Sequence, residues 1–150
     1  MRCLFLVLVP LLLAGLAIPA SAAEANRIGY VSFDQVSIQL RDEMAVVEVD
    51  YSTDPGMSMF LLFFGKGDLQ KKIERSMNFP SAKALEVGLS HAVFTVEDAS
   101  ENYGDRAYWF PGHSFGVTFP RVEVKAPGHT MTYTKANSIP RGFGFFDTMP

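Results

Sequence analysis

Three histidines, His91, His113 and His129, are the side chains of this sequence best suited to metal binding or acid–base chemistry. A neutral imidazole ligates metal ions, and it gains or loses a proton near pH 7. His113 and His129 each follow a Pro-Gly pair and lie sixteen residues apart. If one extended strand joins them, their side chains are roughly 50 Å apart, too far to share a metal ion. We therefore predict no metal site and no cofactor.

Nucleophilic catalysis has little support in the sequence. The single cysteine, Cys3, falls in an apolar N-terminal segment. Ser90 and His91 are neighbours, so on a strand their side chains point to opposite faces. The acidic segment 97–101 matches no calcium-binding loop. We predict no catalytic residue, and a hydrolase or metal-dependent enzyme built from dispersed histidines and carboxylates is only the third hypothesis.

The densest aromatic group outside residues 57–64 is Tyr108-Trp109-Phe110, which contains the only tryptophan. On a strand, Tyr108 and Phe110 share one face and Trp109 takes the other, so one large ring could face a partner. Such a ring would stack on a sugar or anchor a protein contact. The predicted binding residues are Tyr108, Trp109, His113 and His129. The competing interpretation, which we favour from sequence, buries Trp109 between two sheets.

Residues 1–22 have the pattern of a cleavable signal peptide. Arg2 precedes an apolar run from Cys3 to Ile18, and small residues follow it. Sixteen apolar residues span only about 24 Å as a helix, which is short for a transmembrane segment, and Pro10 interrupts them. We expect cleavage near Ala22 and a secreted or extracytoplasmic protein, at the cell surface or in the periplasm. An uncleaved N-terminal anchor is the alternative, and membrane contact is expected only in that case.

The chain after this leader, residues 23–150, has the length of a single domain and contains no cysteine. Removing Arg2 with the leader changes the net charge from −3 to −4. The densest basic group, Lys71, Lys72 and Arg75, is interspersed with acidic residues, as on a solvated helix face. Because neutralising phosphates requires a basic face, we expect no nucleic-acid partner.

Apolar residues alternate along most of the chain, which predicts strands. Residues 27–40 are expected to form a strand with a bulge at Asp34-Gln35, and residues 44–52 to pair with it as a hairpin. Residues 83–96 form one strand or two. Four more short strands are expected at residues 107–110, 114–125, 130–135 and 141–146.

Residues 57–78 break this alternation and predict a helical insertion. Residues 57–64 are almost continuously apolar, which fits a buried strand or a short helix. We favour burial in the core beneath the helix that follows; burial in an oligomer or in a membrane surface is the alternative. That helix is predicted from Leu69 to about Met77, with Asp68 placed to cap it.

About seven strands with one helical insertion predict an all-β fold, an immunoglobulin-like β-sandwich, with an α+β fold as the alternative. Gly142 to Phe146 alternates glycine and phenylalanine, so a neighbouring backbone can approach one face closely while the rings fill the other. The edge of this strand would suit strand addition by another protein or by a second copy. The leading functional hypothesis is a non-enzymatic interaction or structural domain. The second hypothesis is a small-molecule or carbohydrate-binding module.

Overall fold

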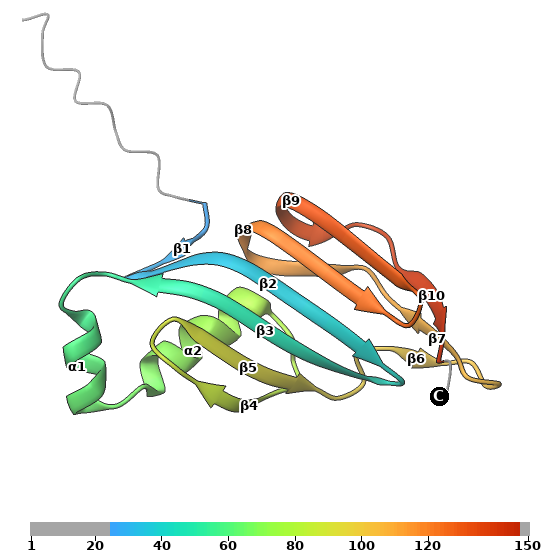
Figure 1. The fold of residues 1–150 in the computed structure, drawn as a ribbon, viewed down its shortest axis with the longest axis horizontal. Helices are drawn as coiled ribbons and strands as arrows, with labels where there is room; N and C mark the ends of the chain where they lie inside the picture. The colour runs from blue at the N-terminus through green and yellow to red at the C-terminus, as the bar shows by residue number, and fades with distance from the viewer. Residues whose placement is uncertain (1–24, 148–150) are drawn as a thin grey trace, which may run out of the picture.

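The computed structural model describes residues 25–147, which form ten strands and two helices. The strands are β1 (Arg27–Ile28), β2 (Val31–Arg41), β3 (Met44–Thr53), β4 (Ala82–Val87), β5 (His91–Val96), β6 (Glu101–Asn102), β7 (Ala107–Phe110), β8 (His113–Ala126), β9 (His129–Ile139) and β10 (Phe143–Phe146). The helices are α1 (Met57–Phe64) and α2 (Gly67–Met77). The molecule is elongated, with α1 at one end and β6, β7 and β10 at the other (Figure 1).

Seven strands form one large sheet in the order β4-β5-β3-β2-β8-β9, with β1 beside β2. β2 and β3 make the predicted hairpin, and their register shifts between Phe33 and Gln35, at the predicted bulge. β2 also pairs with β8 in parallel. A second sheet has the order β10-β7-β6. The protein is therefore mostly β, with a sandwich-like arrangement of strands.

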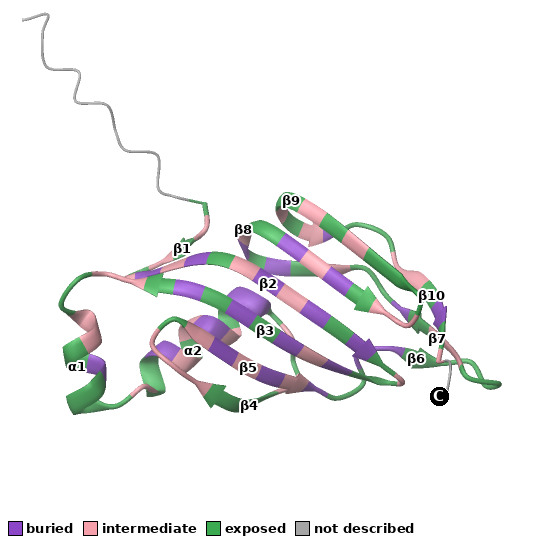
Figure 2. Cartoon of the chain, in the orientation of Figure 1, coloured by how far each residue is buried: buried purple, intermediate pink, exposed green. Residues whose placement is uncertain are grey.

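One face of the large sheet forms the core. Buried residues alternate with more exposed ones along β2, β3 and β5, as the colour bands show (Figure 2). The buried residues of β3 occupy alternate positions along the strand: Ala45, Val47, Val49 and Tyr51. The side chains between them are more exposed, because successive residues of a strand point to opposite faces. The alternation thus sets which face of the sheet is covered.

Helix α2, which includes the predicted helix, packs against the large sheet through three completely buried residues spaced four apart: Leu69, Ile73 and Met77. Its backbone approaches β8 so closely that a Cβ atom on Gly116 would collide with the carbonyl oxygen of Arg75. Glycine at position 116 therefore allows the helix to contact the strand directly.

The three-stranded sheet turns its inner face towards the core. Phe110 and Phe145 are buried there, and Tyr108 stacks on Phe145 with ring centroids 5.5 Å apart. The N–H group of Ala99 donates to the carbonyl oxygen of Glu43 at 2.7 Å. This bond ties the segment before β6 to the turn between β2 and β3.

Two expectations for the helical insertion are wrong. Residues 57–64 form helix α1, but only Leu61 is buried, whereas the preferred expectation placed the whole segment in the core. The physical reason is that α2 covers the sheet, while α1 projects past the end of the sheet (Figure 1). In addition, α2 begins at Gly67, so Asp68 lies within its first turn and does not cap it.

The strand predicted over residues 27–40 divides at Gly29-Tyr30 into β1 and β2, which pair antiparallel, and the remaining strand predictions agree with the structure. Residues 83–96 divide into two strands, β4 and β5, and the last four predicted strands correspond to β7, β8, β9 and β10. The predicted leader, residues 1–22, lies outside the described residues. Between residues 25 and 147, neither helix is long and apolar enough to cross a membrane.

Candidate binding site on the three-stranded sheet

Strand β7 carries the aromatic group singled out in the sequence, and its two neighbours complete the surface around it. β10 pairs antiparallel with β7, so that Gly144 lies opposite Trp109 and Phe146 lies opposite Ala107. On the other side, β6 places Glu101 opposite Trp109. Directly opposed residues share a face of a sheet, so Trp109, Phe146 and Glu101 all belong to the outer face.

Trp109 is exposed, with 41% of its surface accessible to solvent. The favoured expectation of a core tryptophan is therefore wrong, because β7 turns Tyr108 and Phe110 inward and leaves Trp109 outside. The indole lies over β10: a Cβ atom on Gly142 would stand 2.9 Å from two of its carbons, and one on Gly144 would stand 3.7 Å from a third. The two glycines form the floor on which the indole rests.

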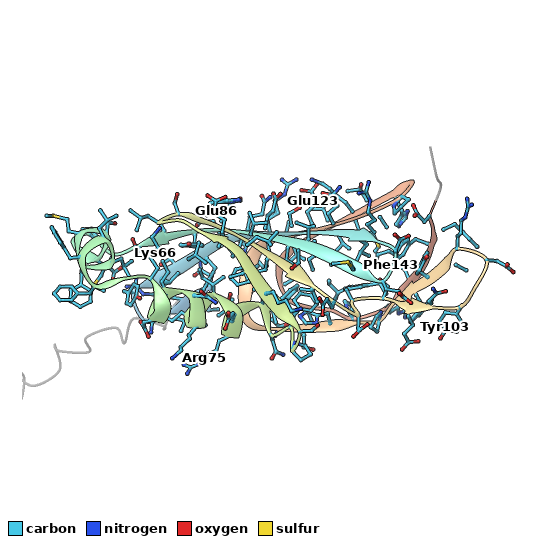
Figure 3. The ribbon with its side chains drawn as sticks, turned by 90° about the horizontal axis from the view of Figure 1, so that it is seen from below. Lys66, Arg75, Glu86, Tyr103, Glu123 and Phe143 are labelled. Atoms are coloured by element: carbon cyan, nitrogen blue, oxygen red, sulfur yellow. The ribbon has the colours of Figure 1, made fainter. Side chains whose placement is uncertain are left out.

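A shallow hollow of about 420 Å³ opens beside the indole. This volume lies within the range of small-ligand pockets, and the lining is almost wholly apolar. Two of its walls, Tyr103 and Phe146, are 71% and 67% exposed. Tyr103 lies in the loop between β6 and β7, at one tip of the molecule (Figure 3). The lining residues are Tyr103, Ala107, Tyr108, Trp109, Gly144, Phe145 and Phe146.

Polar groups position the two tyrosines that border the hollow. The Tyr103 hydroxyl donates to a carboxylate oxygen of Glu101 at 2.9 Å, and this bond raises the pKa of Tyr103. Partial burial and the nearby Asp42 carboxylate raise the pKa of Tyr108. The same Asp42 raises the pKa of Asp147 through a hydrogen bond between the two carboxyl groups and through their repulsion.

His113 lies away from the hollow, at the C-terminal end of α2. Its Nε2 donates to the carbonyl oxygen of Met77 at 2.7 Å, and its ring stacks on Phe79 with centroids 3.8 Å apart. Burial lowers the pKa of His113, which favours the neutral imidazole. The contacts of His113 thus join the end of a helix to the start of β8.

His129 lies at the opposite end of the β8–β9 hairpin from His113. In this hairpin His113 is opposite Ile139, whereas His129 is opposite Ala126, next to the turn. The His129 ring lies 5.9 Å from the ring of Phe143. Neither histidine lines the hollow. Of the predicted binding residues, the structure brings two together there: Tyr108 and Trp109.

His91 lies on the large sheet, with its Nδ1 2.7 Å from a carboxylate oxygen of Asp50. Within the described part of the chain, no group of three or more His, Cys, Asp or Glu side chains could hold a metal ion. The His91–Asp50 pair therefore has no third ligand there.

A Gly-x-Ser-x-Gly spacing was missed when catalytic residues were predicted: residues 112–116 are Gly-His-Ser-Phe-Gly. In hydrolases this sequence forms a sharp turn between a strand and a helix, which exposes the serine. Here it leads into strand β8, where Ser114 lies opposite Ser138 of β9. His113 bonds to the Met77 carbonyl. The segment therefore lacks the geometry of a nucleophile elbow.

Comparison with protein-family models, curated proteins and solved structures finds no match for this chain. A proposal for the function therefore rests on the chemistry of the hollow. An exposed indole on a glycine floor, beside an apolar concavity, can bind a ligand by ring stacking and by burial of apolar surface.

Proposed function

We propose that this protein is a non-enzymatic extracytoplasmic contact module, which binds an extended segment of a partner protein at the three-stranded sheet. One observation carries the proposal: the exposed indole of Trp109 rests on Gly142 and Gly144 beside an apolar hollow. Tryptophan side chains held in this way are frequent anchors of protein contacts. The extracytoplasmic location rests on the leader-like residues 1–22.

Strand β10 offers a means of holding an extended segment. It is an end strand of its sheet, so one of its sides has no strand partner among the described residues. Residues 143–146 include no charge and no proline, which are common devices for blocking a sheet edge. A segment added along β10 would form main-chain hydrogen bonds with it. An outer-face side chain of that segment would then lie beside the hollow.

The chemistry of the hollow favours an apolar side chain over a sugar. Its lining offers almost no polar surface, whereas the hydroxyl groups of a sugar need hydrogen-bond partners when they leave water. A Phe, Leu or Ile side chain loses no hydrogen bond on entering. We expect binding of about micromolar strength, because a four-residue strand buries less area than a standard interface.

A carbohydrate-binding module is the second candidate, and the rim of the hollow favours it. A sugar stacked on the open face of Trp109 could reach the Tyr103 hydroxyl and the Glu101 carboxylate, which lie 2.9 Å apart. Ring stacking with hydrogen bonds from one side only would give weak binding.

Selection from a random heptapeptide library against the exported protein tests the proposal. We expect the enriched peptides to share one large apolar residue, and their affinity to fall about tenfold in Phe146→Ser, which removes a wall of the hollow. Leu85→Ser is the matched control, because Leu85 is 64% exposed but belongs to β4 of the large sheet. Equal binding to both variants would place the site elsewhere. Binding of cello- or chito-oligosaccharides without any peptide enrichment would favour the second candidate.

The immunoglobulin-like topology belongs to the same proposal. Two sheets with aromatic residues such as Phe110 and Phe145 between them support it. An experimental structure with the same strand order but the small sheet detached from the core would contradict it.

A further inference from the structure

Five large apolar side chains of helix α1 are exposed, although the helix has only eight residues. At roughly 200 Å² per phenylalanine, the three phenylalanines alone expose about 400 Å², comparable with the largest apolar patch on a typical soluble monomer. A surface of this kind usually has a covering partner. The five residues are Met59 (65% exposed), Phe60 (51%), Leu62 (65%), Phe63 (79%) and Phe64 (76%).

These side chains surround more than half of the helix. Successive residues are about 100° apart around an α-helix, so the five together span an arc of about 200°. Leu61, on the opposite side, is buried and holds the helix against the domain. The hydroxyl oxygens of Thr53 and Ser58 lie 3.2 Å apart near its start, and the Gly65 N–H donates to the Leu61 carbonyl at its end. Helix α1 is therefore a fixed element that presents an apolar surface.

No charge interrupts this surface. Residues 55–65 contain no acidic or basic residue. The nearest charged residues on either side are engaged in contacts: Asp54 pairs with Arg27 at 2.6 Å, and the Lys66 ammonium group donates to the Val87 carbonyl at 2.8 Å. A surface with this charge pattern suits an apolar medium better than an acidic or basic partner.

A second copy of the protein would cover only part of α1. Eight residues make a helix about 12 Å long, and a facing helix packs along one side of it. Two such helices bury much less than the roughly 800 Å² per partner of a standard interface. A lipid surface, in contrast, covers the whole exposed arc and requires no matching shape.

The segment between β1 and β2 lies beside the start of α1. After β1, the Tyr30 carbonyl accepts a hydrogen bond of 3.0 Å from the N–H of Asp54, three residues before α1.

We propose that α1 docks this protein on a lipid bilayer, with its exposed side chains at the boundary between headgroups and acyl chains. The three-stranded sheet lies at the far end of the molecule and would then face away from the membrane (Figure 1). Lys66, next to α1, and Tyr103, next to the hollow, mark these two ends (Figure 3). The proposal does not depend on the partner-binding function of the hollow, and it holds whether or not the leader is cleaved.

A single fluorophore on α1 tests the proposal. Apart from Cys3 the sequence has no cysteine, so Phe63→Cys in a Cys3→Ser background provides one attachment point for an environment-sensitive dye. With phosphatidylcholine vesicles, the dye emission should shift to the blue and be quenched by brominated acyl chains. A dye on Leu85→Cys should show neither effect, since Leu85 is also exposed (64%, against 79% for Phe63) but belongs to β4. Trp109 emission should stay constant, because Trp109 lies at the other end.

A variant that lacks the three phenylalanines of this surface measures their contribution to binding. In protein that has lost its leader, replacing Phe60, Phe63 and Phe64 together by serine should lower the vesicle-bound fraction about tenfold, because binding scales with the apolar area buried. An unchanged dye emission at position 63 would overturn the proposal. A dimer in light scattering that this variant abolishes, with no response to vesicles, would overturn it in favour of a second copy as the occupant.

Discussion

The indole of Trp109 lies directly over Gly142. A Cβ atom at position 142 would stand 2.9 Å from two carbons of this ring, and it would also collide with the carbonyl oxygen of Phe110. The backbone of β7 cannot shift without disturbing the pairing of Phe110 with Phe143. The close approach of the two strands therefore requires glycine at this position.

Gly142→Ala should lower the free energy of unfolding by about 1–3 kcal/mol, because the added methyl group overpacks the contact between the strands. Urea denaturation measures this loss. Gly144→Ala is the matched control: its Cβ would make ordinary contacts of 3.6 Å and 3.7 Å. We expect it to cost less than about 1 kcal/mol. Equal losses of unfolding free energy in the two variants would contradict the claim that position 142 requires glycine.

His113 should make the fold sensitive to acid. Burial lowers the pKa of His113, whereas the unfolded chain has the ordinary value near 6.5. As the pH falls below about 6.5, the unfolded chain takes up a proton that the folded protein excludes, so the free energy of unfolding decreases. His113→Gln keeps a donor for the Met77 carbonyl and should flatten this dependence below about pH 6.5. Urea denaturation of both proteins at several pH values below about 7 is the test. The same dependence of the free energy of unfolding on pH in the two proteins would contradict the prediction.

Tyr51 should make the fold sensitive to alkali. Burial raises the pKa of Tyr51 to about 12, so between about pH 10 and 12 only the unfolded chain releases the phenolic proton, and stability falls as the pH rises. Tyr51→Phe should reduce this loss. At neutral pH the same variant should cost about 1 kcal/mol, because the Gly88 carbonyl loses its donor at 3.0 Å. A variant as alkali-sensitive as the wild type would show that another group is responsible.

Much of the fold could be predicted from the sequence, because burial on one face of a strand leaves a two-residue period in the sequence. The hairpin of β2 and β3, the bulge after Phe33 and the inward residues of α2 all follow from local patterns. The parallel pairing of β2 with β8 could not be predicted. It joins Gln35 to Arg121, and no local pattern encodes a pairing between segments so far apart.

The site was predicted only in part, for a similar reason. Alternation on β7 identified Tyr108 and Trp109, but the walls Tyr103 and Phe146 come from a loop and another strand. His113 was assigned to the site because it follows a Pro-Gly turn, whereas its partner Met77 lies 36 residues away in the sequence. The favoured burial of residues 57–64 in the core was wrong, because apolar composition indicates that a segment will be covered but not what covers it.

The fluorescence emission of Trp109, the only tryptophan, tests the partner-binding site most directly. The probe is an enriched heptapeptide with one large apolar residue, titrated into the exported protein. We predict a shift of the emission to the blue that saturates in about the micromolar range, since the occupant of the hollow would exclude water from the indole. Leu85→Ser should keep this shift and Phe146→Ser should lose most of it. Peptide binding with an unchanged Trp109 emission would contradict the site proposed for this protein.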